Sequence, residues 1–363
     1  MDDTSDYLRD SFARDGFAYV RGAVGAEVMR RLLAQLKAEL EAPSVAAESG
    51  EVRVVLGEPS SWPTADARRV VEVTPPGDAA HWRELVSSAR LVSALDSLLG
   101  VGAWELPVNG PAPEGGGRVL PRHWYAPVAF PEEPPPGAAA ASSWAPVNRR
   151  GQRWHGWHID IGPGFDTDWA RTVAGHPYQG CVVLVLGSDW ESGCGGTALI
   201  RGSHRWVHAA LSEAGARGVT HQELNAWSYR EAAARRSAAQ LRLEYEMHGS
   251  ETAAEVHQVC GVTGDVVLMH PWLIHGGTTN LGAAPRVLIN GMVRVTEAAF
   301  AAGGCATLPL LSSPLPTPPL PTSPLLSETC GKACIRAEGP ADTRAGGEMQ
   351  GGEMQGGEMQ GGE

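Results

Sequence analysis

The chain has very little lysine: Lys37 and Lys332 are the two lysines among 363 residues, although arginine is plentiful. Schiff-base catalysis needs a desolvated lysine amine, and a phosphate-binding P-loop needs a Gly-Lys-Ser/Thr ending. Neither lysine lies in a setting of either kind. The shortage of lysine therefore excludes these two chemistries.

Long apolar runs, an excess of positive charge and a targeting segment are also absent. No run approaches the roughly 18 apolar residues of a membrane span, and the acidic start resembles neither a secretory signal nor a transit peptide. A net charge of −12 disfavours general binding to a phosphate backbone. We expect a cytoplasmic protein that acts on a small molecule and has no nucleic-acid or membrane partner. The sequence does not predict its oligomeric state.

The cysteines lack the dense, even spacing of a secreted disulfide scaffold. Cys330 and Cys334 lie in a biased tail with no second pair and no histidine nearby, so they do not indicate a zinc site. We read all six as reduced thiols: Cys181, Cys194, Cys260, Cys305, Cys330 and Cys334.

The N-terminal third of the chain has helical periodicity. Residues 25–42 place leucines and a valine on one stripe, which predicts an amphipathic helix. Shorter patterns predict helices near 7–12 and 79–99, with a strand at 16–20. The following Pro- and Gly-rich stretch, 107–153, is typical of long surface loops, broken by one strand candidate at 124–130.

From residue 154 onwards the pattern changes to short, β-branched apolar runs separated by turn residues, as in an all-β sandwich or barrel. A helical segment at about 220–240 interrupts them. Beyond residue 301 the chain is Pro/Leu/Ser-rich and then repeats Gly-Gly-Glu-Met-Gln three times, which cannot supply a packed core. We therefore predict one folded domain, 1–300, with its motifs in 154–296, and a disordered tail, 301–363. The expected strands are 179–186, 197–200, 256–259, 266–269 and 287–295.

One short motif has the residue types of a metal site. His158 and Asp160 form a His-x-Asp, and residues two apart in a strand point to the same side. Two histidines and one carboxylate bind iron(II) on one face of its octahedron and leave positions for substrate and oxygen. A distant second histidine is then required, and both His270 and His275 are candidates.

Four motifs resemble those of the phytanoyl-CoA dioxygenase family, a set of 2-oxoglutarate-dependent oxygenases, over about residues 7–296. The last of them is a Gly-Asp-x-Val-x-x-His-Pro-x-x-x-His-Gly motif, followed by an arginine that opens the next strand. The residues that carry the resemblance are Asp15-Gly16-Phe17, Trp157-His158-Ile159-Asp160, the glycine-rich turn 193–197 running to Gly202-Ser203-His204, and 264–276 with Arg286.

The resemblance implies Fe(II) as cofactor, with 2-oxoglutarate and O2 as co-substrates. It implies that His275 is the third iron ligand, that His270 is structural, and that Arg286 pairs with the distal carboxylate of 2-oxoglutarate. A guanidinium fork can hold a carboxylate through two hydrogen bonds. Thr278 is a second candidate for this carboxylate, although the family often has Ser or another small polar residue where this chain has Gly277.

The resemblance also implies a mainly β fold: a double-stranded β-helix, or cupin-like jelly roll, with flanking N-terminal helices. Asp160 favours hydroxylation, because related iron halogenases have a small residue at this position. Two alternatives stay open: a cupin-like metalloenzyme that does not use 2-oxoglutarate, and a non-catalytic jelly-roll binding module. The first has no need of Arg286, and the intact ligand set counts against the second.

Overall fold

The computed structural model describes twelve segments of the chain, all within the first of two compact units, Met1–Leu325. The predicted tail lies outside the described residues apart from its first two positions. The described segments are 3–41, 46–47, 50–51, 54–62, 70–73, 84–105, 124–132, 156–160, 171–172, 174, 180–239 and 256–302.

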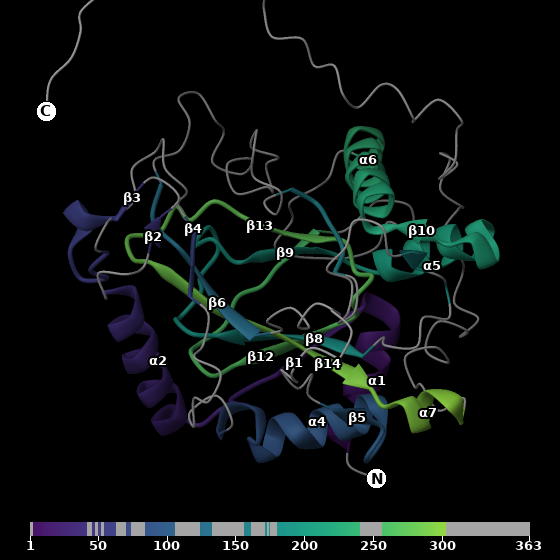
Figure 1. The fold of residues 1–363 in the computed structure, drawn as a ribbon, viewed down its shortest axis with the longest axis horizontal. Helices are drawn as coiled ribbons and strands as arrows, with labels where there is room; N and C mark the ends of the chain where they lie inside the picture. Colours follow the sequence, from purple (N-terminus) through teal and green to yellow (C-terminus); the bar gives the residue numbers. More distant parts are fainter. Residues whose placement is uncertain are drawn as a thin grey trace, which may run out of the picture. The chain divides into compact units, whose positions relative to one another are not determined.

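A large antiparallel sheet, which we call the major sheet, forms one side of the domain (Figure 1). Its longest strand, β14, lies next to β8 and also pairs with the short strand β5 (Trp104–Glu105). The strand order is β1 (Phe17–Val20), β12 (Val266–Met269), β8 (Cys181–Leu186), β14 (Arg286–Val295), β6 (Trp124–Ala129) and β4 (Val70–Val73).

A smaller antiparallel sheet, the minor sheet, consists of β11 (Val256–Gln258), β9 (Thr197–Ile200) and β13 (His275–Gly277), in this order. A single bridge between His158 and His275 extends it by one residue pair. Two further ladders are short: β2 (Ala46–Ala47) with β3 (Gly50–Glu51), and β7 (Arg171–Thr172) with β10 (Val219–Thr220).

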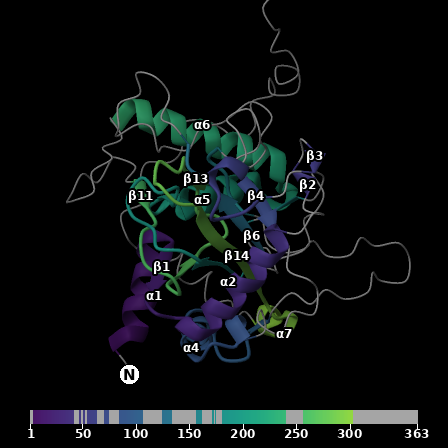
Figure 2. The same cartoon turned by 90° about the vertical axis from the view of Figure 1, so that its left-hand side faces the viewer.

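Helices cover the outer face of each sheet (Figures 1 and 2). The N-terminal helices α1 (Asp3–Asp15), α2 (Ala26–Leu40) and α4 (Ala89–Leu99) share one apolar cluster with the major sheet. Helices α5 (Ser203–Ala214) and α6 (His221–Ala239) share another with the minor sheet. Three short helices complete the described elements: η1 (Pro59–Ser61), η2 (Gly215–Arg217) and α7 (Glu297–Ala301).

Strand β8 shows how the major sheet separates two apolar layers. All six of its residues are buried. Val183 and Val185 pack with the N-terminal helices, whereas Val182, Leu184 and Leu186 belong to a cluster that also includes residues of the minor sheet. This alternation follows from the period of two in a β-strand. The second cluster is therefore the layer between the two sheets.

Two antiparallel sheets that enclose one apolar layer, with helices on both outer faces, form a jelly roll of the double-stranded β-helix type. The predicted fold class is confirmed. The predicted helices at 25–42 and 220–240 correspond to α2 and α6. The strand candidate at 124–130 corresponds to β6, which is an inner strand of the major sheet.

Helix α5 was not predicted from the sequence. Its first turn contains the Gly-Ser-His motif, and Ser203 and His204 are buried. The His204 Nε2 atom is hydrogen-bonded to the Ala13 carbonyl at 3.2 Å, and the Ser203 hydroxyl accepts from the Ile274 N–H at 2.8 Å. The motif thus ties α5 to α1 and to the residue before the candidate ligand His275.

We expect Gly264→Ala to destabilise the fold by about 1–3 kcal/mol. Gly264 has a φ of +90°, and an added Cβ would lie 2.5 Å from the Val24 carbonyl oxygen. Gly57→Ala is the matched control, because nothing lies within 4 Å of its added Cβ. Urea unfolding of both variants measures the difference. Equal stability of the two variants would contradict the structure of this turn.

Buried histidines should make the protein acid-labile. His204 and His270 are each 1% exposed, and burial lowers the pKa of His204 well below its usual value and that of His270 to about 3. In the unfolded chain both groups take up a proton below a pKa of about 6.5. The free energy of unfolding is therefore highest above this pH and falls as the pH decreases towards 3. Between pH 6.5 and 5 we expect the urea midpoint to fall, with His270 contributing a loss of about 1–2 kcal/mol and His204 a loss in the same direction. An unchanged midpoint over this interval would refute the prediction.

Candidate metal centre

Three side chains with metal-ligating atoms converge on the inner face of the minor sheet. One donor atom from each of His158, Asp160 and His275 lies within 4.8 Å of the others. The His275 Nε2 atom is 3.5 Å from Asp160 Oδ2, and the two imidazole ring centroids are 4.3 Å apart. The structure thus brings together the three residues that the sequence and the resemblance proposed as ligands.

The backbone explains why these side chains share one face. The His158 N–H donates to the His275 carbonyl at 2.8 Å, and the His275 N–H donates to the His158 carbonyl at 2.9 Å. Such a directly opposed pair points its side chains to the same side. Trp157 and Ile159 pack into the cluster with α5 and α6, so alternation along the segment turns His158 and Asp160 the other way.

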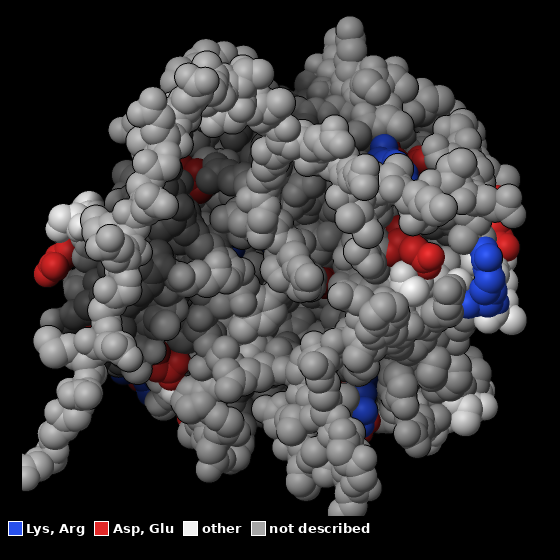
Figure 3. Space-filling view, turned by 45° about the horizontal axis from the view of Figure 1, so that its top comes forward, with Lys and Arg blue, Asp and Glu red and all other residues white. Residues whose placement is uncertain are grey.

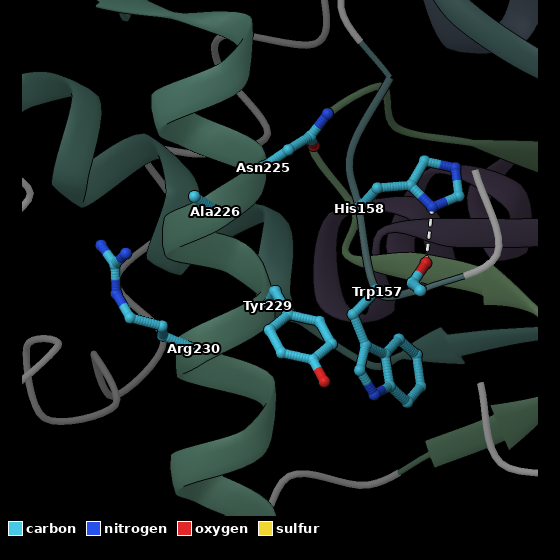
Figure 4. A pocket seen from close by; sticks show the side chains of 7 residues that line it. Trp157, His158, Asn225, Ala226, Tyr229 and Arg230 are labelled. Carbon is cyan, nitrogen blue, oxygen red and sulfur yellow. Dashed lines mark hydrogen bonds between the residues drawn. The ribbon is translucent and has the colours of Figure 1, made fainter. Parts of the chain in front are cut away.

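Hydrogen bonds also orient the two imidazole rings. His158 Nδ1 lies 2.8 Å from the Gly156 carbonyl oxygen, and His275 Nδ1 lies 2.8 Å from the Leu273 carbonyl oxygen; Figure 4 shows the first of these contacts. A carbonyl accepts, so each Nδ1 carries the proton and each Nε2 carries the lone pair. Such a hydrogen bond from the other ring nitrogen to a carbonyl is usual for histidines that bind metals. The donor set therefore fits a divalent metal ion.

The other histidine candidate, His270, has a different environment. It is 1% exposed, and its Nδ1 accepts a hydrogen bond from the Trp272 N–H at 3.0 Å. Its ring packs against His204 and Phe12, with centroids 5.3 and 5.9 Å away. His270 is not part of the group of ligating atoms. Of the two candidates, His275 is thus the one that lies beside His158 and Asp160.

Arg286 is a buried cation without a hydrogen-bond partner at two of its nitrogens. It is 5% exposed, and Nε and Nη1 have no partner in the described part of the chain. Alternation along β14 places it on the same face as Leu288, which belongs to the layer between the sheets. Burial lowers its pKa to about 10, so the guanidinium is charged at neutral pH. An unpaired buried charge is costly, and an anion in this layer would remove the cost.

Unlike the Arg286 nitrogens Nε and Nη1, the Thr278 hydroxyl has hydrogen-bond partners within the protein. Its hydroxyl donates to the Gly196 carbonyl at 2.6 Å and accepts from Gln258 Nε2 at 3.1 Å. Gln258 pairs in register with Ala198, whose side chain belongs to the outer cluster of the minor sheet. The hydroxyl proton is therefore engaged within the minor sheet. A contact between Thr278 and a carboxylate stays a prediction.

Two contacts around the candidate site residues were missed by the sequence analysis. Asn290 Nδ2 donates to the Tyr125 hydroxyl at 2.7 Å, and the Tyr125 side chain acts electrostatically on Arg286. On α6, Asn225 Oδ1 accepts from the N–H of Ile159 at 2.9 Å, the residue between His158 and Asp160. Alternation from Arg286 along the predicted strand could have indicated Asn290, whereas no sequence signal linked α6 to the metal-binding segment.

The described residues of the domain show no segregation of charge on the face in Figure 3. The Lys and Arg side chains visible there lie apart from one another, and most of them have an Asp or Glu side chain nearby. None of the helices in the described part of the chain has the length and apolar content needed to span a bilayer.

Two antiparallel sheets around a group of two histidines and one carboxylate are the fold and donor set of the non-haem iron oxygenases. Residues 12–288 match the sequence model of one family, described as phytanoyl-CoA dioxygenase. This match covers more than half of the chain. The protein thus belongs to the phytanoyl-CoA dioxygenase family, and it is an enzyme of the 2-oxoglutarate-dependent oxygenase class.

Several solved structures are similar to this chain at low sequence identity. They include the α-ketoglutarate-dependent epimerase SnoN from nogalamycin biosynthesis (12% identity, TM-score 0.43, 80% of this chain and 82% of that chain covered). HygX from Streptomyces hygroscopicus, with nickel, 2-oxoglutarate and hygromycin B bound, has 15% identity, a TM-score of 0.42 and coverages of 82% and 88%. The apo form of EctD from S. alaskensis has 17% identity, a TM-score of 0.43 and coverages of 79% and 75%. No curated protein matches.

We expect His158→Ala and His275→Ala each to weaken binding of Co(II), a spectroscopic substitute for Fe(II), by at least about tenfold, because each removes one of three protein ligands. His208→Ala is the control, since His208 is half-buried on α5 outside the ligand group. Absorbance titration of the visible Co(II) bands gives the affinities. Equal affinity of all three variants would show that the group does not bind the metal.

Proposed function

We propose that this protein is an Fe(II)- and 2-oxoglutarate-dependent dioxygenase that hydroxylates a carbon of a small organic substrate. Substrate, O2 and 2-oxoglutarate would be converted to hydroxylated product, succinate and CO2. The observation that carries the proposal is the convergence of His158, Asp160 and His275 within 4.8 Å. The buried Arg286 on β14 of the major sheet supports it, because its side chain points into the layer between the two sheets.

The residues present fit the implied metal. Nε2 of His158, Nε2 of His275 and the Asp160 carboxylate would hold Fe(II) on one side and leave its other side open. When bound, iron together with 2-oxoglutarate supplies the oxidising power that activates O2. The protein's contribution is to fix the three donors in advance, through the backbone bridge and the two Nδ1 hydrogen bonds.

Arg286 is the proposed anchor for 2-oxoglutarate. Its Nε and Nη1 both lack partners in the described residues, so the guanidinium keeps unused hydrogen-bond donors. A carboxylate accepts such charge-assisted hydrogen bonds. The Trp190 ring lies 5.0 Å from the guanidinium carbon and supports it from one side. We retain Thr278 as a secondary contact, which requires its hydroxyl to turn away from Gly196.

Asp160 supports hydroxylation over halogenation. A carboxylate in the ligand group occupies the position that chloride would need beside the iron. Asp160 has its N–H bonded to the Pro271 carbonyl at 3.0 Å, which fixes its backbone against the turn before His275. Turnover in the presence of chloride should therefore give only hydroxylated product, and a chlorinated product in mass spectrometry would refute this assignment.

The test of the function is an anaerobic titration of the protein with Fe(II) and 2-oxoglutarate. We expect the weak visible charge-transfer band of the chelate in the wild type and its loss in His275→Ala. In Arg286→Ala we expect the 2-oxoglutarate concentration at half-saturation to rise by about 10- to 100-fold, because a charge-assisted contact contributes about 1.5–3 kcal/mol.

The control for charge is Arg217→Ala, since Arg217 is exposed on η2. It should titrate like the wild type. A wild-type protein without the band would favour the cupin-like metalloenzyme or the binding module. If Arg286→Ala reaches half-saturation at the same 2-oxoglutarate concentration as the wild type, Arg286 does not bind 2-oxoglutarate.

A further inference from the structure

A cavity of about 330 Å³ lies between α6 and the segment that carries His158. This volume is within the range of small-molecule sites. Helix α6 contributes one face of it through Asn225, Ala226, Tyr229 and Arg230, which are spaced by one helical turn. The opposite wall is Gly156 to His158. Figure 4 shows Ala226 between the longer side chains, so its methyl group leaves the space open.

The pocket adjoins the metal group. His158 lines the pocket and also contributes a ligating atom. Asn225 Oδ1 on α6 accepts a hydrogen bond from the Ile159 N–H at 2.9 Å. This bond holds α6 against the segment that carries His158. A molecule in this pocket would therefore contact the segment that carries His158, one of the three candidate ligands.

The walls combine aromatic rings with one cation. The Tyr229 ring is 38% exposed, and in Figure 4 it points towards the Trp157 indole. Arg230 is the charged residue among the described lining residues, and no hydrogen bond or ion pair joins it to the described part of the chain. The acidic residues nearest to it on α6 face elsewhere: Glu223 is bonded to Thr220, and Glu231 is 2% exposed. Arg230 is therefore the one formal charge among the described lining residues.

We propose that this pocket binds the primary substrate, and that the substrate is a small molecule with a planar or apolar body and one anionic group, a carboxylate or a phosphate. The body lies over Ala226 beside Tyr229 and Trp157. The anionic group binds to Arg230 at the rim, and the end to be oxidised faces His158. This inference rests on the proposed function, because the reacting carbon must lie next to the metal.

Geometry separates this site from the proposed 2-oxoglutarate anchor. Arg286 is 5% exposed in the layer between the sheets, whereas Arg230 is exposed on α6. The helix packs on the outer cluster of the minor sheet. The two cations thus bind different anions, and a change in one should not alter the affinity of the other.

The experiment measures the affinity of three probes for the anaerobic Fe(II)/2-oxoglutarate complex by saturation-transfer NMR. The probes are phenylacetate, phenyl phosphate and the neutral phenylacetamide. We expect at least one anion to bind about two- to fivefold more tightly than the amide, as for a partly screened ion pair. This advantage should disappear in Arg230→Gln, persist in Arg230→Lys and be unchanged in the control Arg217→Gln. Tyr229→Ala should weaken all three probes, and the preferred anion identifies the carboxylate or phosphate class.

The same samples report on the chelate band, which separates the two hypotheses. Arg230→Gln should keep the wild-type affinity for 2-oxoglutarate, because Arg286 is intact. If the band is normal, three results overturn the substrate assignment and leave the proposed function intact: the anions and the amide bind equally, the anion preference is unchanged in Arg230→Gln, or no probe binds at all. A missing band in the wild type refutes the proposed function, whatever the probes do.

Discussion

The site depends on one backbone bridge, the pair of hydrogen bonds between His158 and His275 at 2.8 and 2.9 Å. These bonds join two segments that are far apart in the sequence and place two imidazoles on one face. The Nδ1 contacts with Gly156 and Leu273 then direct both Nε2 atoms to the same point. The ligands are therefore arranged by the folded backbone before any metal binds, which is the requirement for a precise metal geometry.

Apolar residues decide which way the ligand segment faces. Trp157 and Ile159 are 6% and 0% exposed, within the cluster of α5 and α6. Turning the segment over would expose both side chains, at a cost of about 3–6 kcal/mol. This is a large fraction of the total stability of a typical domain, about 5–15 kcal/mol. His158 and Asp160 thus face the interior because their neighbours pack outside, and the same alternation brings Arg286 inside from β14.

The sequence predicted the features that depend on local periodicity. The spacing of His158 and Asp160, the strands and the jelly roll follow from a period of two and from the family motifs. The choice of His275 over His270 needed the resemblance, because both histidines lie in one short segment and only the three-dimensional bridge distinguishes them. The bond from Asn225 to Ile159 depends on packing between distant elements, which no local pattern encodes. For Thr278, the sequence could not show that Gly196 accepts its hydroxyl proton.

Arg286 and Arg230 differ in burial, and burial determines how strongly each guanidinium can bind an anion. Arg286 is removed from water and lacks partners at Nε and Nη1, so an anion there restores hydrogen bonds that the fold itself does not provide. Such a contact is strong and suits a co-substrate common to every turnover. Arg230 is exposed, and water and salt screen its pairing to about 0–1 kcal/mol. A contact of this size discriminates among substrates and still permits product release. Under the two proposals, an arginine would therefore act as an anchor where it is buried and as a selective contact where it is exposed.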